Sequence, residues 1–328
     1  MNLVKIMVES FYFMCSVQFW RMALLWTLSL IFSYLDLFTQ RFMTSKLKLY
    51  PRYSPKGSAN FNSPAGKPVC IITGATSGLG AAAAYALSKE GFYVVLVGRS
   101  SERLSRAISA VKSGNQDSCL KAFEVDLSSF KSIIQFKHSL EQWLLDSKMH
   151  SSVQLLINNA GILATSRRLT SEGYDEMLAT NYMGAFCLTK ILLPLLQNSP
   201  VPSRVVNLTS FTHRNVCCMQ ANRETISGKS FVKSKSYPYA QIYEYSKCLT
   251  WKLIRLLIFQ KYLNAITIPP LRVQFVKQEN GYDEVSGVYF FGGNGRCLQS
   301  SRLSYNSRLA KDLWATSCNL FQELVLNF

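Results

Sequence analysis

Tyr243 and Lys247 stand four residues apart in the segment YEYSK, a spacing that can place a phenol beside an ammonium group. Residues four apart lie on one face of an α-helix, and Pro238 just before them favours a helix start. A free phenol has a pKa of about 10, which is too high for efficient proton exchange at neutral pH. A neighbouring ammonium favours the phenolate and lowers that pKa. The spacing therefore predicts a proton-transfer pair, although a tyrosine on a helix is more often only a packing residue.

A glycine-rich turn lies far upstream of this pair. The apolar run PVCIIT at Pro68–Thr73 is followed by GATSGLG and then by the alanine-rich segment AAAAYALSKEG. This order predicts a strand, a turn and a helix. Gly74 permits the tight turn, Gly78 lets backbone N–H groups approach a pyrophosphate, and Gly80 lets the helix pack close to the strand. A glycine pattern alone is weak evidence, but its place between a strand and a helix favours dinucleotide binding.

The cofactor type is predicted from the end of the second strand, FYVVLVG at Phe92–Gly98. An NAD enzyme would present an acidic residue to the ribose hydroxyls there, whereas this chain has Arg99 followed by Ser100. A guanidinium donates two parallel hydrogen bonds to phosphate oxygens, so it suits a 2′-phosphate. The sequence favours NADP(H) over NAD(H). The alternative is that Arg99 is a solvent-facing loop residue.

These segments and several later ones resemble the short-chain dehydrogenase/reductase family. Thr73–Gly80 matches its TGxxxGxG turn, and Tyr243 with Lys247 matches its YxxxK motif. The resemblance implies an α/β fold with a single doubly wound, Rossmann-type parallel sheet. It also implies hydride transfer between NADP(H) and a carbonyl or alcohol. The other matching residues, in family order, are Asp126 in FEVDLSS, Asn158–Gly161 as NNAG, Asn181 in ATNYMGAF and Ser210 at the end of the strand RVVNLTS.

The resemblance assigns roles to individual residues. It implies a catalytic tetrad in which Tyr243 exchanges the proton and Ser210 hydrogen-bonds the substrate oxygen. Asn181 would hold a water that links Lys247 to solvent, and the lysine would also bond the nicotinamide ribose. Besides Tyr243 and Lys247, the implied cofactor-binding residues are Thr73, Gly74, Thr76, Ser77, Gly78, Leu79, Gly80, Arg99, Ser100, Asp126, Leu127, Asn159, Ala160 and Gly161.

The first forty residues are predicted to be a membrane anchor. Met22–Leu35 carries no charge, and the apolar character extends back to Phe11 with Arg21 as an interruption. A cleavable signal peptide and a buried helix are the alternatives. Residues 41–66 contain five basic residues, three prolines and two glycines after the anchor, so they are predicted to be a linker. Excess positive charge marks the cytosolic side, which predicts that domain 67–328 faces the cytosol at the endoplasmic reticulum or another internal membrane.

Charge and cysteine content narrow the classes of partner. The formal net charge is +17, but there is no arginine-rich arm, zinc-finger spacing or RNP-like motif, so we predict no nucleic-acid partner. Nine scattered cysteines and three histidines show no metal-ligand spacing, so no metal site is predicted. The expected partners are a membrane and a lipophilic small-molecule substrate of the retinoid, polyprenoid or steroid type. A homodimer is left open.

The region after Lys247 departs from the family pattern. The family has a helix, a sixth strand ending in Pro-Gly and a substrate-binding segment there, whereas segment 255–286 is short and contains no Pro-Gly pair. The run LRVQFV at 271–276 is a candidate replacement strand, and SGVYFFGG resembles the final strand. The tail resembles the retinol-dehydrogenase-like branch, which includes an enzyme encoded on the human X chromosome and its plant relatives. The alternative function is a truncated isoform that is catalytically incompetent, namely a membrane-bound nucleotide-binding or interaction protein.

Overall fold

The computed structural model describes residues 7, 11, 14–43, 66–201, 203–232, 236–259, 264–268, 288–291, 297–298 and 300–326. Residues 44–65, which make up most of the predicted linker, lie outside the described residues. The same is true of Pro269, Pro270 and the predicted strand at 271–276.

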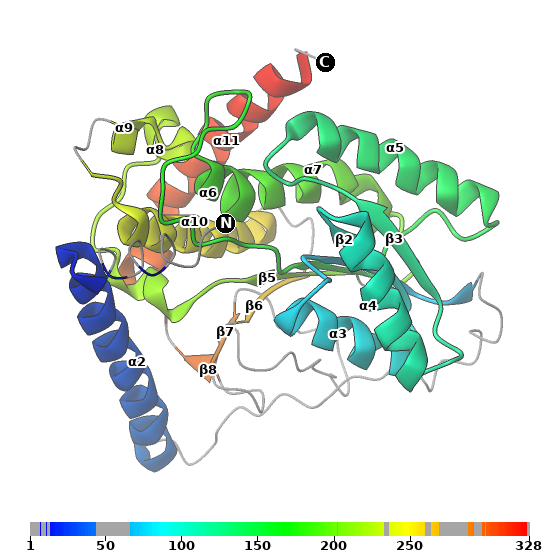
Figure 1. Ribbon diagram of the computed structural model, residues 1–328, viewed down its shortest axis with the longest axis horizontal. Coiled ribbons are helices and arrows are strands. Elements are labelled where there is room, and N and C mark those ends of the chain that lie inside the picture. The colour runs from blue at the N-terminus through cyan, green and yellow to red at the C-terminus, as the bar shows by residue number, and fades with distance from the viewer. Residues whose placement is uncertain are drawn as a thin grey trace.

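The described strands form one twisted sheet in the order β3-β2-β1-β4-β5-β6-β7-β8. The pairs from β3 to β7 are parallel, and β8 pairs antiparallel to β7. This order, which runs outward in both directions from β1 and β4, confirms the predicted doubly wound α/β fold (Figure 1). The strands are β1 (Val69–Thr73), β2 (Tyr93–Gly98), β3 (Leu120–Glu124), β4 (Leu155–Asn158), β5 (Arg204–Leu208), β6 (Asn264–Ile268), β7 (Val288–Phe290) and β8 (Cys297–Leu298).

Continuous apolar strands supply side chains to both faces of the sheet. On β1, Val69 and Ile71 enter one apolar cluster, whereas Cys70 and Ile72 enter the other, as period-two alternation requires. Figure 1 shows the helices on the two faces. One cluster lies under α3 (Gly78–Lys89) and α4 (Ser101–Gly114), and the other under α5 (Phe130–Asp146) and α7 (Gly184–Gln197).

The sixth sheet position is filled earlier in the sequence than expected. Helix α10 (Tyr239–Phe259) is followed at once by β6, which pairs in parallel with both β5 and β7. The sequence NAITI therefore fills this position, and the run at 271–276 lies outside the described residues. Its β-branched residues suit a strand, and Pro269 and Pro270 after it cannot donate ladder hydrogen bonds. A Pro-Pro pair thus stands where the family has Pro-Gly, and β7 matches the predicted final strand.

Shorter elements and a C-terminal helix complete the domain. Helix α11 (Ser307–Leu326) packs its buried face, which includes Leu313 and Leu320, into the same apolar cluster as α7. The short elements are α6 (Glu176–Leu178), η3 (Ala179–Met183), η4 (Phe211–Asn215), α8 (Arg223–Ser227), α9 (Lys229–Val232) and η5 (Arg302–Tyr305).

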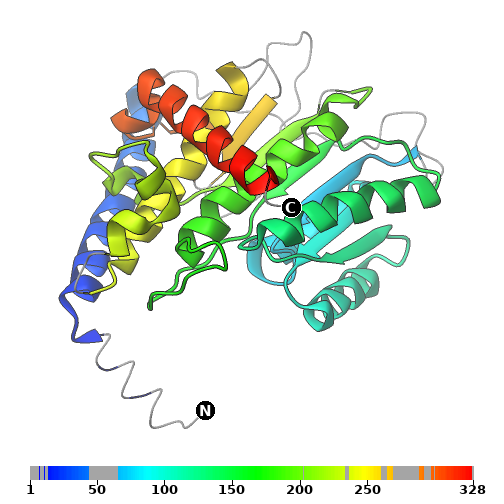
Figure 2. The same ribbon diagram turned by 90° about the horizontal axis from the view of Figure 1, so that it is seen from above.

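The N-terminal helix α2 (Val17–Met43) lies beside α10, at the end of the molecule remote from β3 and α4 (Figure 2). Its segment Val17–Thr39 is long and apolar enough to be a candidate membrane span. The segment Glu176–Gln197 meets the same criteria but is 89% buried, as expected of a core helix. Among the described residues, α2 is therefore the candidate for membrane contact.

Candidate functional site

The glycine turn between β1 and α3 has the conformation that the sequence predicted. Gly74 and Gly78 have φ angles of 64° and 51°, a region that favours glycine. A Cβ on Gly80 would overlap the carbonyl oxygen of Gly74, so only glycine lets the helix approach this closely. The first turn of α3 has no acidic residue, so its positive dipole end is available to an anion.

Thr73 and Asn159 brace the turn against the end of β4. The Thr73 hydroxyl accepts hydrogen bonds from the backbone N–H groups of Asn159 and Ala160, both at 3.0 Å. The Asn159 amide donates to the carbonyl oxygens of Thr73 and Gly74 at 2.8 and 3.1 Å. Thr73 therefore acts behind the pocket wall, where it holds two strand ends in register.

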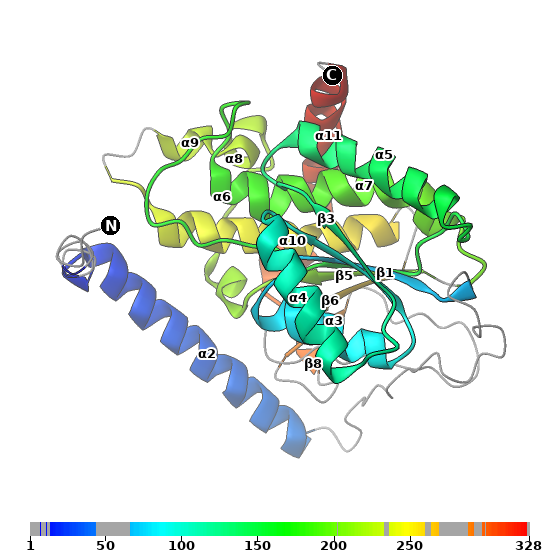
Figure 3. The same cartoon turned by 45° about the vertical axis from the view of Figure 1, so that its right-hand side comes forward.

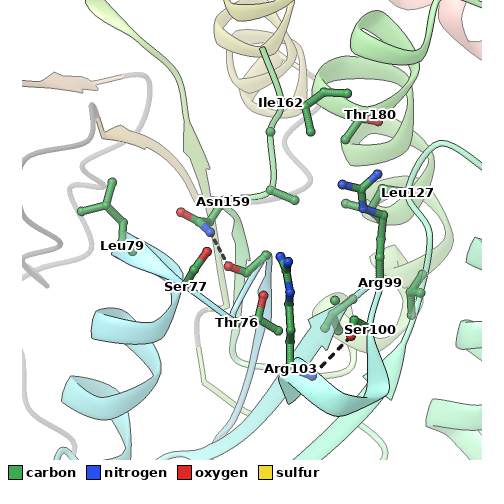
Figure 4. A pocket seen from close by; sticks show the side chains of 17 residues that line it. Thr76, Ser77, Leu79, Arg99, Ser100, Arg103, Leu127, Asn159, Ile162 and Thr180 are labelled. Carbon is green, nitrogen blue, oxygen red and sulfur yellow. Dashed lines mark hydrogen bonds between the residues drawn. The ribbon is translucent and has the colours of Figure 1, made fainter. Parts of the chain in front are cut away.

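A pocket of about 380 Å³ opens at the carboxyl ends of these parallel strands. Ligands in open α/β sheets bind at this position. Figure 4 shows its labelled side chains around one cavity. Of the predicted cofactor residues, the pocket is lined by Gly74, Thr76, Ser77, Gly78, Leu79, Arg99, Ser100, Leu127, Asn159, Ala160 and Gly161. It is also lined by Val97, Gly98, Arg103, Val125, Ile162 and Thr180, which the sequence did not single out.

Two guanidinium groups enter this pocket from the end of β2 and the start of α4. Figure 4 shows the side chains of Arg99 and Arg103 directed toward the cavity. Ser100 caps α4 by accepting a hydrogen bond from the Arg103 backbone N–H at 3.3 Å. Arg99 also lies 3.6 Å from Glu176, which forms a shorter ion pair with Arg168 at 2.9 Å. Arg103 could have been found from its spacing, because it follows Arg99 by about one helical turn.

Asp126 and Leu127 take different positions after β3. Leu127 lines the pocket, whereas Asp126 lines a neighbouring hollow. The Asp126 carboxylate accepts hydrogen bonds from the backbone N–H and the hydroxyl of Ser128, at 2.9 and 2.7 Å. These contacts stabilise the turn into α5. In this structure Asp126 therefore supports the pocket wall from outside.

Asn181 sits in the π-helical turn η3, a distortion that often occurs at functional sites. Its side-chain carbonyl accepts from the Ile162 N–H at 2.7 Å, and its amide donates to the Ile162 carbonyl at 2.9 Å. The amide also donates to the Ser246 hydroxyl at 3.0 Å. The Asn181 main-chain carbonyl accepts from the Thr250 hydroxyl at 2.9 Å. Asn181 thus connects the pocket loop to α10.

Ser210 and Tyr243 meet although they are 33 residues apart in sequence. Ser210 caps the short helix η4, and its hydroxyl accepts from the Thr212 N–H at 3.3 Å. Burial raises the pKa of Tyr243, and a hydrogen bond with Ser210 opposes that rise. The two hydroxyl groups therefore share one partly buried site.

Lys247 reaches the same site from the next turn of α10. Its Nζ lies 5.6 Å from the centre of the Tyr243 ring and 3.4 Å from the Leu208 carbonyl oxygen. A Cβ on Gly161 would come within 2.9 Å of this Nζ and 3.3 Å of the Asn181 Oδ1. Gly161 also lines the large pocket, so the lysine lies behind the wall at that end.

Burial changes the electrostatics expected for the pair. It lowers the pKa of Lys247 to about 8, because the charged form loses its hydration. The Tyr243 pKa is raised, not lowered as the sequence predicted, since desolvation outweighs the opposing effects. In the protein without ligand, the Tyr243 pKa therefore does not show the lowering that the sequence predicted. Burial keeps Tyr243 protonated, and the phenol is the form that can donate a proton.

The proteins that this chain resembles belong to the family that its motifs indicated. The sequence model of the short chain dehydrogenase family matches residues 68–221. Polyprenol dehydrogenase from Homo sapiens is 27% identical, over 77% of this chain and 84% of that protein. Retinol dehydrogenase 13 from Mus musculus is 34% identical, over 45% of this chain and 42% of that protein. A crystal structure of an uncharacterized protein from Mycobacterium paratuberculosis shares the fold, with a TM-score of 0.61, 24% identity and coverage of 83% and 98%.

Proposed function

Because this chain belongs to the retinol-dehydrogenase-like branch of the short-chain dehydrogenase/reductase family, we propose that it is an NADP(H)-dependent oxidoreductase. It would transfer hydride between the nicotinamide and a carbonyl or alcohol group of a lipophilic substrate. One observation carries the proposal. The pocket begins at a glycine turn with two arginines and ends at Gly161, behind which Lys247 and Asn181 lie.

The pocket residues fit a dinucleotide phosphate. The glycine turn exposes the N-terminal end of α3 to a pyrophosphate, and Arg99 and Arg103 can pair with a 2′-phosphate. Thr180 lines the pocket, and its hydroxyl is a buried group without a hydrogen-bond partner among the described residues. A ligand donor or acceptor would satisfy it. Bound NADPH would supply the hydride.

The chain's own residues supply the proton. As a phenol, Tyr243 can donate to a carbonyl oxygen that gains negative charge, and Ser210 can hydrogen-bond that oxygen. The Lys247 ammonium stabilises the phenolate that remains after this transfer. The Asn181 main-chain carbonyl, beside Thr250, is the proposed contact for a water that returns the proton.

The relatives and helix α2 suggest the substrate class and the location. The names of two relatives indicate a polyprenol and a retinol, both long apolar alcohols. We therefore propose an apolar isoprenoid-type aldehyde, ketone or alcohol as substrate, with a steroid-type substrate as a further candidate. Contact of α2 with a membrane, with the domain on the cytosolic side, would place the enzyme where such molecules and NADPH are both available.

The test uses the full-length protein in detergent with NADPH and a panel of retinal, polyprenal and steroid ketones. We expect oxidation of NADPH with at least one member, and loss of turnover in Tyr243→Phe with NADPH binding retained. Tyr245→Phe is the matched control, because Tyr245 is on the same helix but donates to the Cys218 carbonyl at 2.8 Å. NADPH binding without turnover of any member would favour the nucleotide-binding protein instead. Turnover that survives Tyr243→Phe would refute the role of the phenol.

A further inference from the structure

The face of α2 that contacts the catalytic domain combines apolar packing with polar contacts. Leu37 belongs to the apolar core of the domain, and Met22, Trp26 and Leu30 pack against it. Gln18 donates to the Ser236 hydroxyl at 2.8 Å. Arg214 donates to the Ser33 hydroxyl at 2.8 Å and to the Asp36 carboxylate at 2.7 Å. These contacts extend over about 27 Å of helix, at the usual rise per residue. From Gln18 to Leu37, α2 is thus held to the domain, through η4, α10 and β8; Figure 3 shows its course along this side of the molecule.

The middle of this face contacts the proposed reaction site. The Trp26 Nε1 donates to the Glu244 carboxylate at 2.8 Å, and Arg21 lies 3.4 Å from it. The Glu244 side chain is only 2% exposed and also accepts from Asn215 at 3.2 Å. The Trp26 ring lies against the Tyr243 ring, with centroids 5.5 Å apart. Trp26 and Arg21 therefore attach the middle of α2 to the Glu244 carboxylate of α10.

The opposite face of α2 is apolar and exposed. In a helix that faces water, the outer face is polar, so the apolar outer face of α2 departs from that pattern. An exposed apolar surface of this extent marks a site of contact with a protein or a membrane. The exposed side chains recur at helical spacing and are Val17, Trp20, Leu24, Leu28, Ile31, Phe32, Tyr34, Leu35 and Phe38, each at least 40% exposed.

We propose that α2 lies in the plane of the membrane surface, with its exposed apolar face in lipid and the catalytic domain on its opposite face. The inference rests on the proposed membrane attachment and specifies its geometry. If α2 crossed the bilayer, the domain attached along its length would have to enter the hydrocarbon with Glu244 and Arg214. Charged side chains at that depth are costly. A helix in the membrane plane places its apolar face in lipid and keeps the charged residues of the domain outside the hydrocarbon.

Charge supports lipid rather than a protein as the occupant of the apolar face. The chain carries a formal net charge of +17, which suits anionic headgroups. Trp20 and Tyr34 have the amphipathic rings that are enriched at the bilayer interface. In sequence, α2 ends with Arg41 in its last turn and is followed by the basic residues Lys46, Lys48, Arg52 and Lys56. A lipophilic substrate could then pass from the membrane to Tyr243 along the helix that carries Trp26.

Protease accessibility of both chain ends tests this geometry. The full chain, with different epitope tags at its two ends, is synthesised with sealed microsomal vesicles and digested with and without detergent. An in-plane helix leaves both ends on one side, so both epitopes are lost together or both survive together. Protection of one epitope alone would overturn the inference but leave membrane attachment intact. If the protein does not float with the vesicles, both the attachment and the inference fail.

Substitutions on the outer face add a quantitative test. Leu24→Gln and Ile31→Gln should each reduce binding to vesicles of phosphatidylcholine and phosphatidylserine about tenfold, because each removes an apolar side chain from lipid. Thr27→Gln is the matched control, since it changes an exposed polar residue of the same helix. The thermal unfolding midpoint should be unchanged in all three. Unaltered binding of both apolar variants would contradict lipid contact at this face.

Discussion

Arg103 offers the sharpest test of cofactor choice, because it is the basic residue that the sequence did not single out. Arg99 lies near Glu176, which offsets part of its charge. Arg103 lines the same pocket, and no ion pair of its side chain is found among the described residues. We therefore expect Arg103→Ala to weaken NADPH binding more than Arg99→Ala does, while NADH binding changes little.

The magnitude follows from the chemistry of the contact. A hydrogen bond to a charged group contributes about 1.5–3 kcal/mol. Because Arg103 is exposed, the lower end applies, and about 1.5 kcal/mol corresponds to a roughly tenfold rise in the dissociation constant for NADPH. Dissociation constants for NADPH and NADH can be measured on the full-length protein from quenching of tryptophan fluorescence.

Arg106→Ala is the matched control for this experiment. Arg106 lies on the same helix, but its guanidinium is exposed and pairs with Glu102 at 3.2 Å, outside the pocket. Its removal should leave both affinities within about twofold. Equal weakening of NADPH and NADH by Arg103→Ala, or no change in either, would refute the assignment of Arg103 to a 2′-phosphate.

Three further predictions concern pH and packing. Burial lowers the Lys247 pKa to about 8, so its ammonium is present below that pH and carbonyl reduction should fall as pH rises through 8. In Lys247→Arg any remaining activity should not show this fall, and a wild-type rate that stays flat to pH 10 would contradict the reasoning. Burial also lowers the pKa of His213 to about 4 from 6.5, so the folded protein binds its proton less well than the unfolded chain. The free energy of unfolding should thus drop by up to about 3 kcal/mol as pH falls from 6.5 through 4. Urea titrations at several pH values should show that the free energy of unfolding depends less on pH in His213→Gln, but not in the exposed control His138→Gln. An unchanged pH dependence in His213→Gln would show that His213 is not its cause. Gly80→Ala should destabilise the fold by about 1–3 kcal/mol and weaken both nucleotides, since its Cβ meets the Gly74 carbonyl. Gly91→Ala, with a φ of 93° but open space, should destabilise without weakening nucleotide binding, and normal binding in Gly80→Ala would refute the packing argument.

Local sequence patterns determined most of the fold and the position of the cofactor pocket. The apolar runs and the glycine turn predicted the strands, the turn and its pocket end, because strand, turn and helix preferences act over a few residues. The resemblance of the motifs to a family supplied the parallel sheet. The YxxxK spacing likewise placed Tyr243 and Lys247 on one helical face. Arg99 was predicted at the pocket for the same reason, since it follows β2 directly.

Contacts between distant segments decided the rest. Lys247 is buried against Gly161 and the end of β5 at Leu208, and Tyr243 is buried too, so their sequence spacing could not give the directions of the two pKa shifts. The sixth strand at Asn264–Ile268 is defined by pairing with β5 and β7. Hydropathy predicted that α2 is apolar, but only the tertiary structure placed Trp26 against Tyr243 across more than 200 residues of chain. The physical reason is that burial and long-range packing depend on which segments meet in the fold, and local preferences do not carry that information.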